Sequence, residues 1–197
     1  MNIVLATRNR KKVEEMKRMF PGHKITFKTL DAYPGCPEVE EDGLTFRANA
    51  KKKALAVARF TGCPALADDS GLEVKALDNA PGVYSARYAG ENADDRKNVN
   101  KILRQLRPVI NNKERKARFV CCIVFALPDG KCRTFTGYVS GRIAEKPKGY
   151  NGFGYDPIFC PSGHDRTFAE MADFEKDALS HRGRAMKKLH AYLESIL

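Results

Sequence analysis

The spacing of apolar residues changes along this chain, and that change limits the folds open to it. In the first part, short apolar runs typical of strands alternate with segments whose apolar residues recur every three to four positions, as in helices. Later, two strand-like segments, 116–127 and 132–140, flank the turn sequence Pro128-Asp129-Gly130-Lys131. Alternating strands and helices followed by a hairpin predict an α/β protein, a mixed sheet with helices packed on it.

The expected elements and the length of the chain are those of one domain over residues 1–197. Besides the hairpin, we expect strands at 2–7, 24–30, 63–67 and 72–77, and helices starting at residues 9, 45, 92 and 180. No stretch approaches the roughly 20 apolar residues of a membrane span. The apolar run at the N-terminus is too short for a signal peptide and follows no basic leader, so we expect a cytoplasmic protein without a membrane partner.

The charge of the chain points to an anionic partner without identifying it. Lys and Arg number 35 against 24 acids, which gives a net charge of +11. A nucleic acid, a membrane surface and a phosphorylated small molecule would all suit this excess. Net charge alone therefore does not choose between them.

Two adjacent acids, Asp68 and Asp69, end the apolar run 63–67 and precede Ser70-Gly71. Two like charges side by side repel unless a proton or a cation relieves them. Mg²⁺ is commonly held by one or two carboxylates together with substrate phosphates. A solvated turn is the alternative, since Asp, Ser and Gly all form turns, and this segment alone leaves both open.

The segment 7–12 is a candidate phosphate-binding loop, and the carboxylate of Glu41 and the ammonium group of Lys53 could flank one ligand. Four of the six residues in Thr7-Arg8-Asn9-Arg10-Lys11-Lys12 are basic, and they join the first strand to the first helix, where backbone N–H groups favour an anion. Thr7 and Asn9 would donate or accept hydrogen bonds and Lys12 would act as a point charge. Lys51 to Lys53 could equally be a solvated helix face.

Two further segments combine groups that suit a purine base. Gly152 to Asp156 offers flexible backbone, two aromatic rings and a carboxylate, although an ordinary tight turn would use the same residues. Ser180-His181-Arg182 opens the last helix, where cations run against the helix dipole unless a ligand uses them. A hydrolase triad of Ser70, His181 and an Asp lacks the GxSxG motif.

Taken in order, these segments resemble the inosine triphosphate pyrophosphatase family, which hydrolyses non-canonical purine nucleoside triphosphates. The resemblance runs nearly end to end. It rests on Thr7-x-Asn9-x-x-Lys12, Glu41-x-Gly43-x-Thr45-Phe46, Asn49-Ala50-x-x-Lys53-Ala54, Ala67-Asp68-Asp69-Ser70-Gly71-Leu72, the segment 80–88, Gly152-Phe153-Gly154-Tyr155-Asp156-Pro157 and Ser180-His181-Arg182.

The resemblance implies Mg²⁺-dependent cleavage of ITP, dITP or XTP to the monophosphate and pyrophosphate. It implies a homodimer and an elongated mixed sheet with flanking helices, in two lobes with the active site in the cleft between them. Asp69 would be the general base and a metal ligand, Glu41 the other carboxylate on Mg²⁺, and Asp68 would assist. No stable nucleic-acid partner is expected.

The resemblance also implies which residues contact the substrate. Thr7, Asn9 and Lys12 would cradle the triphosphate, Arg8, Arg10 and Lys11 would contribute mainly backbone, and Lys53 and Ser70 would add phosphate contacts. The base pocket would be bounded by Phe153, Gly154, Tyr155, Asp156, Lys176, His181 and Arg182.

Two other functions are the alternatives. A basic nucleic-acid-binding module would show affinity that falls steeply with salt and would have no use for the acid cluster. A related nucleotidase for modified pyrimidines shares the general fold, but the segments 153–156 and 180–182 resemble those of the purine-acting enzymes.

Overall fold

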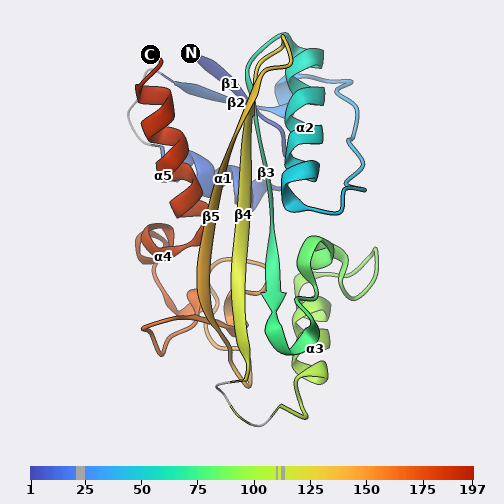
Figure 1. The fold of residues 1–197 in the computed structure, drawn as a ribbon, viewed down its shortest axis with the longest axis vertical. Coiled ribbons are helices and arrows are strands. Elements are labelled where there is room, and N and C mark those ends of the chain that lie inside the picture. Colours follow the sequence, from blue (N-terminus) through green and yellow to red (C-terminus); the bar gives the residue numbers. More distant parts are fainter. Residues whose placement is uncertain (21–24, 110, 112–113) are drawn as a thin grey trace. The chain divides into compact units, whose positions relative to one another are not determined.

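The computed structural model describes residues 1–20, 25–109, 111 and 114–197 and contains six strands and five α-helices (Figure 1). The strands are β1 (Asn2–Leu5), β2 (Thr26–Thr29), β3 (Ala65–Val74), β4 (Lys116–Ala126), β5 (Cys132–Ile143) and β6 (Phe159–Pro161). The helices are α1 (Arg10–Arg18), α2 (Phe46–Thr61), α3 (Asp95–Gln105), α4 (Asp173–Leu179) and α5 (His181–Glu194). None of the described helices is long and apolar enough to cross a bilayer.

The strands form one sheet in the order β2-β1-β3-β4-β5-β6. β1 pairs in parallel with both β2 and β3, whereas β5 and β6 are antiparallel. The parallel pairs come from the alternating first part of the chain, where a helix separates successive strands, because parallel strands need such a crossover. The predicted α/β class with a mixed sheet and flanking helices is confirmed.

The strands expected at 63–67 and 72–77 are one strand, so Asp68-Asp69 is not the solvated turn that the sequence left open. β3 continues without interruption from Ala65 to Val74 and carries both acids in its middle. Ser70 and Gly71, which are typical turn residues, lie inside this strand. Three residues that were expected to extend the next strand, Lys75 to Leu77, instead form a short 3-10 helix.

The helices start close to the residues predicted from the sequence, whereas one short helix and one short strand in the last third of the chain were not predicted. Thr45 caps α2 by accepting a hydrogen bond from the backbone N–H of Ala48, at 3.1 Å. The helix ends at Gly62, whose φ of +65° is a left-handed conformation that glycine adopts without strain. The predictions did not include α4 or β6, and residue 24 of the second expected strand lies outside the described residues.

The described chain divides into two compact units, and residues of β3, β4 and β5 are shared between them. Unit 1 comprises residues 1–69, 121–137 and 182–197. In this unit α1 and α5 cover one face of the sheet, where Met16 and Leu189 pack on Leu66 and Ile123. α2 covers the opposite face, where its alanines pack on Ala65 and Ala67 (Figure 1).

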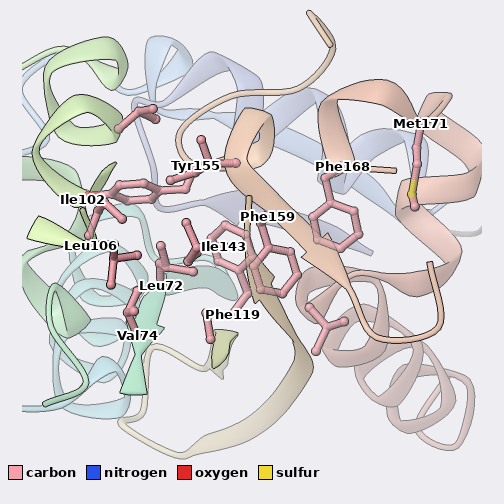
Figure 2. Packing of buried hydrophobic residues seen from close by; sticks show 14 residues of the cluster. Leu72, Val74, Ile102, Leu106, Phe119, Ile143, Tyr155, Phe159, Phe168 and Met171 are labelled. Atoms are coloured by element: carbon pink, nitrogen blue, oxygen red, sulfur yellow. The ribbon is translucent and has the colours of Figure 1, made fainter. Parts of the chain in front are cut away.

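Unit 2 comprises residues 70–120 and 138–181 and has its own hydrophobic core. The rings of Phe119, Phe159 and Phe168 pack together in it (Figure 2), with the centroids of Phe119 and Phe159 at 4.7 Å. α3 adds Ile102 and Leu106 to the same cluster. Burying side chains of this size contributes about 1.5–3 kcal/mol each, so each unit has apolar contacts enough to position polar side chains firmly.

Candidate active site

Asp68 and Asp69 lie on opposite faces of β3, because successive side chains of a strand alternate. Asp68 shares its face with Leu66 and therefore meets α1 and α5, whereas Asp69 shares its face with Ala67 and meets α2. Both carboxylates are buried, with 0% of Asp68 and 6% of Asp69 exposed. Adjacent in sequence, the two acids have separate surroundings.

Asp68 is held by two cations. Lys12 Nζ lies 3.1 Å from its Oδ1, and Arg182 donates to its Oδ2 at 2.9 Å. Arg182 in turn pairs with Glu15, which is also buried. Burial opposes ionisation of Asp68, but the charges of Lys12, Arg182 and Lys53 outweigh it and hold its pKa well below the usual range. Asp68 is therefore an ionised member of a buried network that ties β3 to α1 and α5.

Asp69 has a different electrostatic character. Its Oδ2 accepts a hydrogen bond from the Asn49 side chain at 3.0 Å, and Asn49 accepts one from the Gly43 backbone at 2.7 Å. Burial raises the pKa of Asp69 to about 6, with a further rise from the charge of Glu41, against the lowering effects of Lys53, Lys12 and Asn49. A carboxylate with a pKa close to neutral is suited to accept a proton during a reaction.

Lys53 connects the carboxylate groups. Its Nζ lies 2.9 Å from Oε1 of Glu41 and donates to the backbone carbonyl of Asp68 at 2.8 Å. Because Lys53 is on α2 and largely buried, the helix fixes one positive charge beside Glu41 and Asp69. The neighbouring Lys52 faces solvent and pairs with Asp42.

Glu41 and Asp69 fit a small divalent cation, because their mutual repulsion contributes to the raised pKa of Asp69 and a cation would relieve it. Among the described residues, no group of three or more His, Cys, Asp or Glu side chains is arranged to hold a metal. A site with two carboxylates matches the habit of Mg²⁺, which takes its remaining ligands from water and substrate phosphates.

This electrostatic arrangement predicts an unusual pH dependence for the metal-free protein. The folded Asp69 carboxyl binds its proton more tightly than the unfolded one, so its contribution to the free energy of unfolding falls as the pH rises from 3.8 to about 6. Without Mg²⁺ at pH 8, Asp69→Asn should therefore raise stability, on the order of 2 kcal/mol. At pH 4 the two proteins should melt together. Thermal melts with and without Mg²⁺ measure this, and a variant that melts lower at pH 8 would contradict the assignment.

The segment 7–12 forms the N-terminus of α1. The Asn9 side chain caps this helix by accepting from the backbone N–H of Lys12 at 3.2 Å, and Thr7 Oγ1 accepts from the backbone N–H of Asn9 at 3.2 Å. Arg8 donates to the carbonyl of Cys36, while Arg10 and Lys11 are exposed. The helix N-terminus with Lys12 beside it is suited to an anion, as predicted for a phosphate cradle, and the contacts themselves stay a prediction.

The residues expected at the base pocket do not all lie together in the structure, and one group of them surrounds Asp156. Asp156 accepts from Lys176 Nζ at 2.6 Å and from the Phe153 backbone N–H at 2.8 Å. Lys176 also lies 5.0 Å from the centroid of the Phe153 ring. Gly154 donates to Asp95 at 2.8 Å. These contacts, all within unit 2, form an ordered group around one buried ion pair.

Tyr155 is placed in the core of unit 2 rather than at an open surface. It is 4% exposed, belongs to the cluster in Figure 2, and donates from its hydroxyl to the Ser85 carbonyl at 2.9 Å. Burial raises its pKa far above the usual range. Of the two aromatic residues predicted to contact a base, the half-buried Phe153 retains the more accessible ring.

His181 and Arg182 are consecutive but have different partners. His181 stacks on Phe119 within unit 2, with ring centroids 4.6 Å apart and planes inclined by 7°. Arg182 belongs to unit 1 and joins Asp68 and Glu15. Ser70 is the first residue of unit 2 and is half-buried. Substrate roles for these three residues stay predictions.

The sequence reasoning assigned no role to Glu15, Asn49 and Asp95. Asn49 lies in a motif that carried the family resemblance, and its contact with Asp69 now gives it a place in the site. Glu15 lies one turn after Lys12 on the same helix face, and this spacing is the signal that could have linked the two.

Comparison with known proteins gives the family. The model of the Ham1 family matches residues 3–192. The chain belongs to the Ham1 family. It is 50% identical over 191 residues to a dITP/XTP pyrophosphatase of Geobacter sulfurreducens, covering 97% of this chain and 96% of the relative. A relative of the same name from Halalkalibacterium halodurans is 47% identical over 191 residues, covering 97% of this chain and 98% of the relative.

Solved structures agree with the fold. A HAM1 protein from Coxiella burnetii matches with a TM-score of 0.90 at 43% identity, covering 99% of each chain. The Ham1 protein of Staphylococcus aureus matches with a TM-score of 0.88 at 42% identity, covering 100% of each chain. The family and the mixed α/β fold predicted from the sequence are thus both confirmed.

Proposed function

We propose that this chain is a Mg²⁺-dependent nucleoside triphosphate pyrophosphatase that hydrolyses dITP, XTP and ITP to the monophosphate and pyrophosphate. The observation that carries the proposal is Asp69, a buried carboxylate with a pKa of about 6 beside Glu41 and Lys53. The names of the relatives support the reaction and the substrates dITP and XTP.

Asp69 is the proposed general base. It would accept a proton from the attacking water, for which a pKa close to the working pH is favourable. The hydrogen bond from Asn49 holds one carboxylate oxygen in place. Asn49 is in this way a positioning residue.

The positive charges around Asp69 would bind the triphosphate. Lys12 and Lys53 supply two ammonium groups, and the N-terminus of α1 supplies backbone N–H groups that point outward from the helix. Mg²⁺ held by Glu41 and Asp69 would neutralise charge that develops on the phosphates. Placing these groups before the substrate arrives lowers the cost of reorganisation during the reaction.

Selection of the base is proposed to rest on hydrogen bonds to the 6-oxo group of the purine. Adenine carries an amino donor at that position, so a site that donates to O6 would leave its own donors unpaired with ATP. Lys176 is the proposed donor in unit 2, because an ammonium group has three N–H bonds and can donate to more than one acceptor besides Asp156. Guanine shares the 6-oxo group, so rejection of guanine would have to involve its 2-amino group.

Turnover of a panel of nucleoside triphosphates tests this proposal. With Mg²⁺ present, kcat/KM measured by pyrophosphate release should be at least about 100-fold higher for dITP, XTP and ITP than for ATP. Modified pyrimidine triphosphates belong in the same panel. Equal rates for dITP and ATP would contradict the proposed selection of the base. Faster turnover of a modified pyrimidine triphosphate would favour the alternative function, a nucleotidase for modified pyrimidines.

The homodimer and the placement of the reaction in a cleft between two lobes are proposals that rest on the resemblance. The homodimer is tested by the mass of the protein in solution, measured by light scattering.

A further inference from the structure

A hollow of about 680 Å³ is lined by residues of unit 2, and none of the residues assigned to the candidate active site lines it. Helix α3, labelled in Figure 1, and the segment after β5 form its walls. Its charged lining consists of five basic residues and one acidic residue, Glu145. The basic residues are Lys97, Lys101, Arg104, Arg107 and Lys146.

The basic residues follow one face of α3. Lys97, Lys101 and Arg104 are spaced by four and three positions, so they form a row along the helix. The opposite face carries Val99 and Ile102 into the core of unit 2. Like charges spaced in this way destabilise a helix by about 0.2–0.5 kcal/mol per pair. The row therefore lowers the stability of α3, and another interaction must offset this loss.

Intramolecular contacts do not explain the row. Within the described parts of the chain, no ion pair or side-chain hydrogen bond is found for Lys97, Arg104, Arg107 or Lys146. The helix dipole would favour Arg104 near the C-terminus, but it disfavours Lys97 in the first turn. Most of the positive charge in the hollow is thus left for a partner.

Lys101, in the middle of the row, differs from the other basic residues because it has partners within the protein. Its Nζ lies 4.2 Å from the centroid of the Tyr88 ring and donates to the Tyr88 carbonyl at 2.5 Å. The Tyr88 hydroxyl donates to Gln105 on the same helix. One cation is therefore held in place, with exposed cations before and after it along the helix.

The form of the hollow favours an extended anion over a compact ligand. Small-molecule sites bury most of the ligand among apolar side chains and a few fixed polar groups. Here Lys97, Arg104, Arg107 and Lys146 are all exposed, and three of the ten lining residues, Ala89, Leu103 and Pro147, are apolar. From Lys97 to Arg104 the helix rises about 10 Å, which spans more than one phosphate of a nucleic-acid strand.

We propose that this row of basic residues binds the phosphodiester backbone of single-stranded nucleic acid, without sequence preference and reversibly with salt. A single row on one helix matches one strand, and exposed Lys and Arg bind phosphates chiefly by releasing counterions. Such binding differs from a stable nucleic-acid complex, which the sequence did not lead us to expect. The inference does not depend on the proposed catalysis.

Fluorescence anisotropy of a labelled single-stranded oligonucleotide, measured between about 50 and 200 mM NaCl, tests the proposal. The variant Lys97→Glu/Arg104→Glu/Arg107→Glu should weaken binding at least tenfold. It should also reduce the slope of log affinity against log salt by about 2, since each lost contact on a single strand is worth about 0.7. Turnover of dITP should be unchanged in this variant, which also reports that the protein is folded.

The matched control is Lys17→Glu/Lys75→Glu/Lys187→Glu, which removes the same charge from exposed lysines elsewhere. It should change the affinity less than threefold. Equal losses in the two variants would overturn the proposal in favour of diffuse attraction by net charge. Tighter binding to a duplex of the same length, equal binding to anionic lipid vesicles, or no binding at low salt would also overturn it.

Discussion

Replacing Asp69 with asparagine should lower kcat for dITP by about 10³-fold while the protein remains folded, because a positioned general base contributes about 10²–10⁴-fold. The amide retains the shape of the side chain and can still meet Asn49, but it cannot accept a proton. It also removes one of the two proposed Mg²⁺ ligands, so the concentration of Mg²⁺ needed for half-maximal binding should rise.

Asp42→Asn is the matched control for this change. Asp42 is an exposed acid next to Glu41, and its partner Lys52 is exposed as well. Its replacement removes the same charge near the same helix and should leave kcat within about twofold, since exposed ion pairs contribute little. If both variants lost activity equally, the loss would come from the change in the local electrostatic potential and not from the removal of the Asp69 carboxylate.

Arg182→Met should lower the free energy of unfolding by about 3–5 kcal/mol, because it leaves two buried carboxylates without their shared cation. Arg182 is 2% exposed and pairs with both Glu15 and Asp68. For a protein of this size the melting temperature should fall by roughly 10 °C. Thermal and urea unfolding at pH 7.5, a pH at which both acids are normally ionised, measure the effect.

Arg184→Met is the control for Arg182→Met. Arg184 follows two residues later on α5 and is exposed, so its replacement should change stability by less than about 0.5 kcal/mol. Adding Glu15→Gln to Arg182→Met should recover part of the loss, since it removes one of the two buried negative charges that have lost Arg182. An Arg182→Met protein as stable as the wild type would contradict the structural role of the buried network.

The sequence identified most of the charged residues of the candidate site, but it did not predict which side chains they contact. The acid pair, the basic segment at α1 and Lys53 were all found from residue types and spacing, and the structure places Lys12, Glu41 and Lys53 beside the acids. The sequence left a turn at Asp68-Asp69 open and placed two separate strands around it, because Ser70 and Gly71 are typical turn residues. β3 passes through them, and strand alternation then gives the two acids different surroundings.

Arg182 shows a second limit of sequence reasoning. The resemblance grouped it with His181, yet consecutive residues of a helix point about 100° apart and so meet different neighbours. Its partner Glu15 lies 167 positions earlier, and no local pattern links residues at that separation. The raised pKa of Asp69 depends on burial beneath α2, which likewise requires the tertiary structure.

We infer that this chain converts dITP to dIMP and pyrophosphate with Asp69 as the base. The most direct test is a product analysis of dITP incubated with the wild-type protein and with Asp69→Asn, each with and without Mg²⁺. The wild type should yield equal amounts of dIMP and pyrophosphate, only when Mg²⁺ is present, and the variant should yield almost none of either. Release of orthophosphate, or turnover by the variant at the wild-type rate, would contradict it.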